Sequence, residues 1–229
     1  MFHRATGIGS LPHSSADAAI KIIRENLIHI PHWPQLPQRT PAEGLIRQYL
    51  NPLMDEGLIS LKPGLIQTPF FNEGDHHWDE RVLRYYEILI GIEEQQLSAE
   101  DCPFAFAAEA AEGFYRFLDE NWDLPHTEAI KGQLSSPVTV GLQVTDRAGS
   151  SAFYNNQLRE LLVKTLTYHA RWQVKQLGRF GKPVLLFIDD PGVYGYGTSG
   201  YIGLGREDIQ NSLREVIAGI KEDGGSVGV

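Results

Sequence analysis

Cysteine is almost absent from this chain of 229 residues, and Cys102 is the only one. A single cysteine excludes an internal disulfide and a metal cluster held by several thiolates. Any metal bound by these residues alone would therefore need histidine and carboxylate ligands. Long apolar runs are missing too, since no stretch approaches the ~20 apolar residues of a membrane helix. The first residues lack the apolar core of a signal peptide, so we expect a cytoplasmic protein without membrane contact.

Positive charge is scarce as well. Twenty Lys and Arg residues stand against 29 Asp and Glu, which gives a formal net charge of −9. Such a chain repels phosphate backbones and anionic lipid, so we expect no nucleic-acid partner. Internal repeats, heptads and low-complexity tracts are absent, and proline and glycine are scattered along the sequence. We therefore expect one domain over residues 1–229.

Hydrophobic periodicity indicates alternating strands and helices. Strands are expected at 5–9, 27–30, 58–61, 130–134, 183–188 and 226–229, and helices at 14–27, 41–50, 79–96, 151–177 and 209–220. The continuous apolar run at 183–188 is typical of a strand buried on both faces. Residues 62–78 predict an irregular insertion. The prolines of 31–37 predict an exposed, semi-rigid loop.

This alternation places the chain in the α/β class. Two architectures fit, an open doubly wound sheet and a (β/α)8 barrel, and both carry their chemistry at the carboxyl ends of the strands. About five or six strands are present, whereas a full barrel has eight in ~250 residues. The sheet is therefore either open or part of an incomplete barrel.

Two carboxylates, Asp189 and Asp190, directly follow the apolar run at 183–188. A carboxylate at the end of a buried strand can hold a substrate ammonium or act as a base. The structural alternative is that it caps a neighbouring helix or turn. Because successive strand residues point to opposite sides, we expect only one of the pair to face a cavity.

Ile8, Gly9 and Ser10 follow the first predicted strand. Glycine at this place lets a ligand approach backbone N–H groups, and Ser10 offers a hydroxyl. An ordinary turn before a serine N-cap explains the same residues equally well. The residues by themselves predict an α/β domain with a small-molecule cleft that contains Asp189.

Other motifs give weaker evidence of a functional site. Residues 195–200 match G-x-G-x-x-G, but the preceding strand ends several residues earlier and the next helix begins several residues later, so we expect a glycine loop and no nucleotide. His29 with His32, and His76 with His77, could ligate a metal, although neither pair has a third ligand at suitable spacing. We expect these four to be exposed loop histidines.

Four segments occur in the same order in a known family. They are 6–12 (Thr-Gly-Ile-Gly-Ser-Leu-Pro), 131–139 (Lys-Gly-Gln-Leu-Ser-Ser-Pro-Val-Thr), 187–191 (Phe-Ile-Asp-Asp-Pro) and 225–229 (Gly-Ser-Val-Gly-Val). Together they resemble the catalytic domain of cobalamin-independent methionine synthase, within the uroporphyrinogen-decarboxylase/methionine-synthase-like barrels. The 28–37 run and residues 43–46 resemble the shorter, single-domain relatives of that enzyme.

The resemblance implies a (β/α)8 barrel and a methyl transfer to the thiol of homocysteine, which zinc activates and which yields methionine. It matches Ile8, Gly9, Ser10 and Asp189 with the family positions that hold the amino-acid end of homocysteine. Glu43 is a weaker match to a family glutamate at the substrate amine. The resemblance assigns no catalytic residue within these positions.

Departures from the family pattern modify these expectations. The family's zinc ligands begin after the strand that here ends at Val229, so the chain resembles the N-terminal part of a longer barrel. We expect it to lack zinc ligands, to be inactive alone and to self-associate. Gly195 and Gln143 replace family residues that contact the folate donor. The expected methyl donor is therefore either methyl-folate or a methyl-corrinoid protein.

Two other function classes remain open. One is a uroporphyrinogen-decarboxylase-like or corrinoid-dependent methyltransferase activity of the same superfamily, which would use the same strand ends on another substrate. The other is a noncatalytic small-molecule binding module, which should bind its ligand without zinc.

Overall fold

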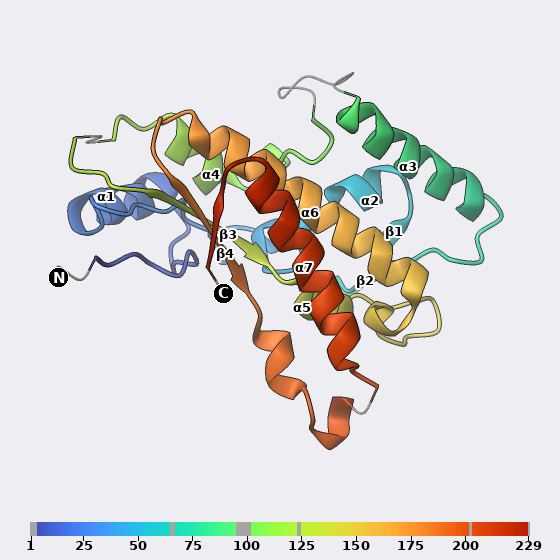
Figure 1. The fold of residues 1–229 in the computed structure, drawn as a ribbon. Coiled ribbons are helices and arrows are strands. Elements are labelled where there is room, and N and C mark those ends of the chain that lie inside the picture. Colours follow the sequence, from blue (N-terminus) through green and yellow to red (C-terminus); the bar gives the residue numbers. More distant parts are fainter. Residues whose placement is uncertain (1–3, 65–66, 95–101, 123–124, 202, 229) are drawn as a thin grey trace.

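The computed structural model describes residues 4–64, 67–94, 102–122, 125–201 and 203–228. The helices are α1 (Ala16–Asn26), α2 (Asn51–Asp55), α3 (Trp78–Glu93), α4 (Glu112–Leu118), α5 (Pro137–Gln143), α6 (Asn156–Gly178) and α7 (Arg206–Glu222) (Figure 1). The strands are β1 (Ile59–Leu61), β2 (Pro69–Phe71), β3 (Ile130–Ser135), β4 (Val184–Asp189) and β5 (Ser226–Gly228). Positions 65–66 of the expected insertion, 95–96 of the expected helix and 229 of the expected last strand lie outside the described residues.

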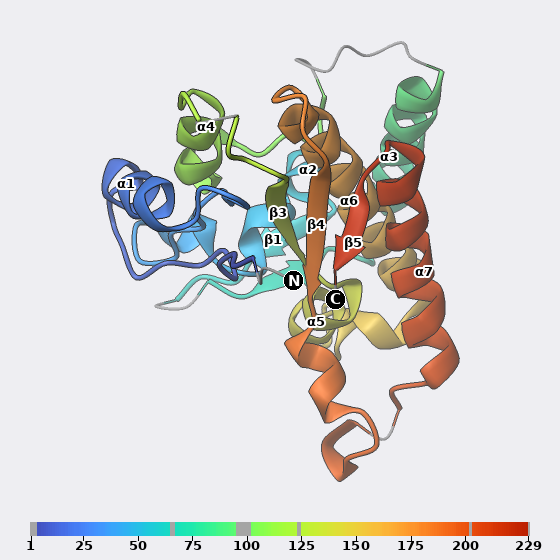
Figure 2. The same ribbon diagram turned by 60° about the vertical axis from the view of Figure 1, so that its left-hand side comes forward.

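The strands form two small sheets. β1 and β2 pair antiparallel, whereas β3, β4 and β5 form a parallel sheet in that order. Figure 2 shows the three parallel strands side by side, with α6 and α7 on one side of them. The α/β class is confirmed, and the described residues form no closed barrel.

Two extended segments continue the parallel sheet beyond β3. His32 forms a parallel bridge with Lys131 of β3, and Gln35 forms a parallel bridge with Ser10. The N–H of Gln35 donates to the carbonyl of Gly9 at 3.0 Å, and the N–H of Leu11 donates to Gln35 at 3.0 Å. Five extended segments therefore lie in the order in which they occur along the chain.

The expectation of an exposed loop at 31–37 is wrong for most of that segment. Residues 31–36 are all buried, and Trp33 and Leu36 have no exposed surface. Proline favours extended backbone and lacks only the N–H. The Pro31 carbonyl still accepts a hydrogen bond from the N–H of Lys131 at 2.9 Å. A proline-rich run can thus lie inside a sheet as long as its carbonyls and its few N–H groups face the neighbouring strands.

The two faces of the parallel sheet differ in chemistry. Gly132 faces α6, because a side chain there would meet Leu177 at 2.9 Å. Alternation then places Lys131, Gln133 and Ser135 on the opposite side. Their register partners on β4 share that side, which we call the inner face: Leu185, Phe187 and Asp189.

Local signals account for several helix starts. Ser15 caps α1, Ser136 caps α5 ahead of Pro137, and Asn155 caps α6, each with a side-chain oxygen that accepts backbone N–H groups. The helix expected from residue 151 therefore begins only after Asn155. The helix expected over 41–50 is instead a pair of short 3-10 turns followed by α2. The brief strand expected at 27–30 is absent, since pairing begins only at His32.

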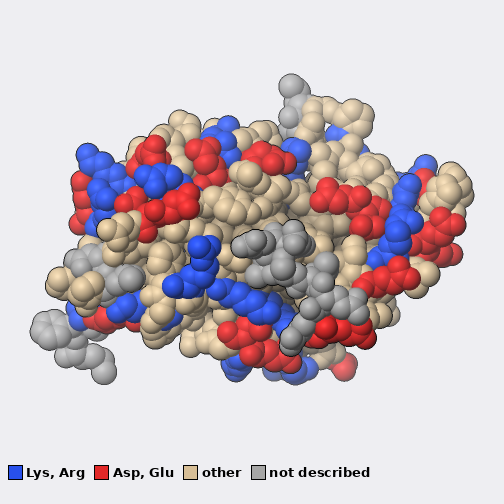
Figure 3. All heavy atoms as spheres, turned by 90° about the horizontal axis from the view of Figure 1, so that it is seen from above, with Lys and Arg blue, Asp and Glu red and all other residues tan. Residues whose placement is uncertain are grey.

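Ion pairs join neighbouring helices at the surface. Arg116 of α4 contacts Asp17 of α1 at 2.6 Å, and Arg171 of α6 contacts Asp223 beside α7 at 3.0 Å. Figure 3 shows basic and acidic side chains interspersed over the face that it presents. None of the described helices combines the length and the apolar character that a membrane crossing requires.

Two histidines are buried in the fold. His32 was expected in an exposed loop, but it is 1% exposed because its segment pairs with β3. His169 of α6 is fully buried beside Tyr49 and Phe106. Burial lowers the pKa of each ring to about 4. Both rings are therefore neutral in the folded protein at pH 7.

These histidines predict a loss of stability in acid. The unfolded chain binds a proton at each ring near pH 6.5, whereas the folded chain does so only near pH 4. Between these values the unfolded state holds more protons, so the free energy of unfolding should fall as the pH is lowered. Urea titrations at several pH values measure the free energy of unfolding. Its change with pH should be smaller in His169→Gln than in the unsubstituted chain. Equal slopes in the two proteins would contradict the role of His169.

The outer edge of β5 predicts self-association. Within the described part of the chain no strand pairs with that edge, and Ser226 is exposed. Unpaired edges recruit a second copy, and an added lysine opposes this. We expect light scattering to give a mass above 25.6 kDa and Ser226→Lys to lower it. A monomer at every concentration tested would refute this expectation.

Candidate functional site

The candidate site lies at the carboxyl edge of the parallel sheet. Ser135 and Asp189 are register partners at the ends of β3 and β4. Counting three residues onward from the bridge between His32 and Lys131 puts Gln35 level with Leu134. Leu134 pairs with Ile188, so Ser10, the bridge partner of Gln35, is level with the last residues of β4. The structure thus brings residues 8–10 and Asp189 to the same edge of the sheet.

Asp189 faces inward and its neighbour does not. Asp189 lies on the inner face, and no described residue donates a hydrogen bond to its carboxylate. Burial raises the pKa of this carboxyl, and the charge of Lys131 partly offsets that effect. Asp190 instead accepts from the Thr139 hydroxyl at 2.9 Å and caps the 3-10 helix Pro191–Gly195. The second oxygen of Asp190 has no partner but is buried, so of these two described carboxylates Asp189 is the more accessible to a ligand.

Segment 8–10 (Ile8, Gly9 and Ser10) crosses the inner face of β3. Gly9 has a φ of +127°, and a Cβ there would lie 2.5 Å from the side-chain amide carbon of Gln133. Glycine is required here by both conformation and space. The Ser10 hydroxyl donates to Gln35 at 2.7 Å. Within the described residues the N–H groups of Gly9 and Ser10 donate to no acceptor; Gly9 is buried and Ser10 is exposed.

Lys131 lies beneath segment 8–10 and was missed from the sequence. Its ammonium donates to the Ile8 carbonyl at 2.6 Å and to the Gln133 side chain at 3.4 Å. It also lies 5.1 Å from the centre of the Phe187 ring. Burial lowers the pKa of this ammonium to about 8, although Asp189 raises it. The available signal was a charged residue inside the strand that precedes Ser135.

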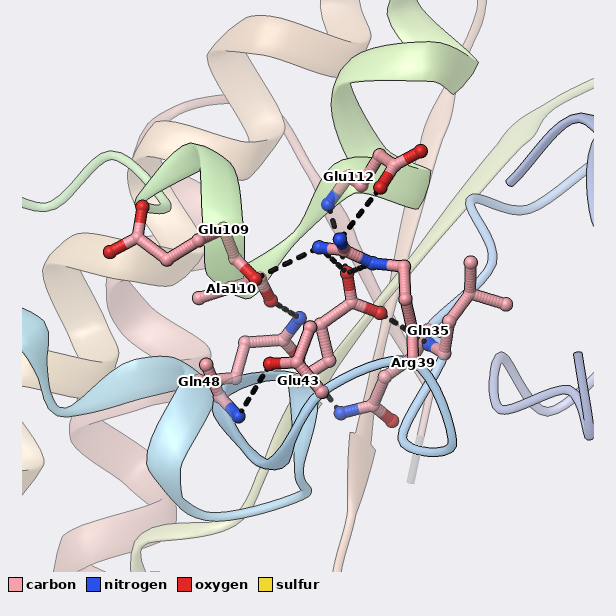
Figure 4. A network of polar contacts seen from close by, with 10 residues as sticks. Gln35, Arg39, Glu43, Gln48, Glu109, Ala110 and Glu112 are labelled. Atoms are coloured by element: carbon pink, nitrogen blue, oxygen red, sulfur yellow. Dashed lines mark hydrogen bonds and ion pairs between the residues drawn. The ribbon is translucent and has the colours of Figure 1, made fainter. Parts of the chain in front are cut away.

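Glu43 belongs to a separate network (Figure 4). Its fully buried carboxylate accepts from the N–H of Leu36 at 3.0 Å, from the N–H of Glu112 at 3.1 Å and from Arg39 at 2.6 Å. Both oxygens are occupied by the protein itself. Among the described residues no contact joins Glu43 to Asp189. The structure therefore supports a structural role for Glu43, which ties the 36–43 loop to the start of α4.

A groove of about 740 Å³ lies beside this edge. The Ser135 hydroxyl ties one wall to the strand end, because it donates to the Leu45 carbonyl at 2.5 Å. Asp189 and segment 8–10 are not among its described lining residues. The lining includes Leu45, Ile46, Arg47, Thr68, Pro69 and Gln143.

The described residues do not fit a metal ion. They contain no group of three or more His, Cys, Asp or Glu side chains arranged to hold one. His76 and His77 are exposed, with their ring centres 3.9 Å apart and the rings tilted by 45°, and His32 is buried with one ring nitrogen bonded to the Trp33 carbonyl. The zinc implied by the family resemblance has no ligand set here.

The glycine loop at 195–200 does not form a nucleotide-binding turn. Ten residues, 196–205, separate the end of the Pro191–Gly195 turn from α7, and a second 3-10 turn at Ser199–Tyr201 lies among them. Tyr194 and Tyr196 are exposed on this loop, which projects from the body of the fold in Figure 1. The loop therefore does not join a strand directly to a helix, as the dinucleotide-binding fingerprint does.

Comparison with known proteins adds no family assignment. No model of a known protein family matches the chain, and no curated protein or solved structure matches it.

Substitution of Gly9 should disturb the edge. In Gly9→Ala the methyl group meets Gln133 and the backbone is strained, so we expect a loss of about 1–3 kcal/mol in the free energy of unfolding. Gly149→Ala is the matched control, because its φ is also positive, at 94°, but nothing lies within 4 Å. Denaturant titration compares the two. A loss no larger in Gly9→Ala than in the control would show that Gln133 does not constrain this position.

Proposed function

We propose that this chain binds homocysteine as part of a methyltransferase related to cobalamin-independent methionine synthase. The observation that carries the proposal is the position of Asp189 and segment 8–10 at one edge of the sheet. These are the positions that the family resemblance assigns to the amino-acid end of the substrate. Glu43 is left out of the proposed site because its oxygens are occupied.

The chemistry of the two groups suits a zwitterion. The Asp189 carboxylate is an acceptor without a donor among the described residues, so it can receive hydrogen bonds from a substrate ammonium. The N–H groups of Gly9 and Ser10 are donors without an acceptor there, so they can receive a carboxylate. An α-amino acid carries an ammonium and a carboxylate on the same carbon atom, so one ligand would offer a group to each end.

The order of the strands favours a barrel-type winding as the finer description of the fold. In a doubly wound sheet the strand order reverses at a switch point. Here the extended segments follow chain order from segment 8–10 through 32–35 to β3, β4 and β5. Continued in the same sense, this order is that of a (β/α)8 barrel, of which five strands would be present.

The methyl transfer itself belongs to the proposal only as an implication of the resemblance. The described residues hold no zinc ligands, so no step through zinc is derived from them. The donor would be methyl-folate or a methyl-corrinoid protein, and Gln143 at the end of α5 lines the groove beside the strand edge.

Removal of the Asp189 charge tests the proposal. In Asp189→Asn we expect homocysteine binding to weaken by about 1.5–3 kcal/mol, the value of a charged hydrogen bond, or roughly 10- to 150-fold in Kd. Calorimetric titration with homocysteine measures this. Asp190→Asn is the control, because it removes the same charge one residue away and keeps the oxygen that caps the following turn. Equal affinities in Asp189→Asn and the unsubstituted chain would refute the role of Asp189.

A further inference from the structure

Lys131 presents a buried positive charge without a negative partner in contact. The residue is 1% exposed, and it forms no ion pair with any carboxylate in the described residues. Buried charges in proteins are almost always paired, because removal of an ion from water is costly. Only neutral groups, the Ile8 carbonyl and the Gln133 side chain, accept from this ammonium. The missing counter-charge requires an explanation.

The charged surroundings of Lys131 are few. Asp189 on β4 is the acidic group that acts on it, and it lies beyond ion-pair distance. His32, its bridge partner, is neutral at pH 7 because burial lowers its pKa to about 4. Gln133 on its own strand and Phe187 on β4 carry no charge. Among the described residues of β3 and β4 on the inner face, Lys131 and Asp189 are the side chains that can carry charge, and no ion pair joins them.

The ammonium is covered by the backbone of segment 8–10. Its shortest hydrogen bond, 2.6 Å, holds the Ile8 carbonyl, and Gly9 rests against Gln133 next to it. A ligand at this segment would not touch Lys131. It would still feel the charge, because the ammonium is buried and buried charges are screened less than exposed ones. An anionic ligand group bound to the N–H groups above would supply the missing counter-charge.

We propose that Lys131 is a positioning residue that makes this edge selective for ligands with a carboxylate, because it holds the Ile8 carbonyl and places a positive charge beneath segment 8–10. The inference rests on the proposed function and adds to it that two residues serve different groups of the ligand. Lys131, acting through segment 8–10, serves the carboxylate end of an α-amino acid, and Asp189 serves the ammonium end.

Three ligands separate the two ends. Homocysteine carries both charged groups, 3-mercaptopropylamine lacks the carboxylate, and 4-mercaptobutyrate lacks the ammonium. Calorimetric titrations under reducing conditions compare the unsubstituted chain, Lys131→Met and Asp189→Asn. Methionine is close to lysine in length, and replacement of a buried charge by an apolar side chain is often neutral for folding. Circular dichroism and thermal unfolding verify that each variant is folded.

The expected pattern is a crossed one. Lys131→Met should weaken the binding of homocysteine and of 4-mercaptobutyrate by about 10-fold or more and leave the binding of 3-mercaptopropylamine unchanged. Asp189→Asn should weaken the binding of homocysteine and of 3-mercaptopropylamine and leave the binding of 4-mercaptobutyrate unchanged. Equal weakening of all three ligands in Lys131→Met would overturn the proposal, since it would indicate a general structural role. Unchanged homocysteine binding in that variant would overturn it too.

A pH series on the unsubstituted chain gives an independent readout that needs no folded variant. Burial lowers the pKa of Lys131 to about 8, so the ammonium loses its proton as the pH rises through that value. The carboxylate of 4-mercaptobutyrate is ionised throughout this range, so its affinity should fall between pH 7 and 9. A flat profile would overturn the proposal. Absence of homocysteine binding at pH 7 would instead refute the proposed function, which keeps the two failures distinct.

Discussion

The hydrogen bond from Lys131 to the Ile8 carbonyl connects the beginning of the chain to the centre of the sheet. Segment 8–10 has only one bridge to its neighbour, at Ser10, and no regular strand of its own. A charged donor at 2.6 Å is stronger than a neutral one, and it fixes the segment across more than 120 residues of sequence. Together with the hydrogen bonds between Gln35 and residues 9–11, that contact holds the segment at the candidate edge.

Local signals determined what the sequence could predict. The apolar run of β4 and the helical spacing of apolar residues in α7 each act over a few residues, and both elements were predicted correctly. The burial of 31–36 depends on pairing with β3, about 100 residues later in the chain. The position of Lys131 likewise depends on contacts with residues near the start of the chain. Periodicity contains no information on such pairings, so these features required coordinates.

Glu43 and Asp189 show why a resemblance in sequence is not enough to assign a site. Glu43 is a fully buried carboxylate and Asp189 a half-buried one, and the sequence resemblance matches both with family positions near the substrate amine. Glu43 receives hydrogen bonds from Arg39 and two backbone N–H groups, whereas no described residue donates to Asp189. The number of donors already committed to a carboxylate decides whether it can serve a ligand. That number depends on the loop around Glu43 and is not visible in a motif.

The prolines of 31–37 have a consequence for how the sheet aligns while it forms. Only the N–H of Gln35 meets the Gly9 carbonyl. A slip of one residue in one direction would present Pro34, which has no N–H, and a slip in the other would present Leu36, whose N–H is held by Glu43. Pro34 and Glu43 thus each disfavour a slip of one residue, in opposite directions, between the first two segments.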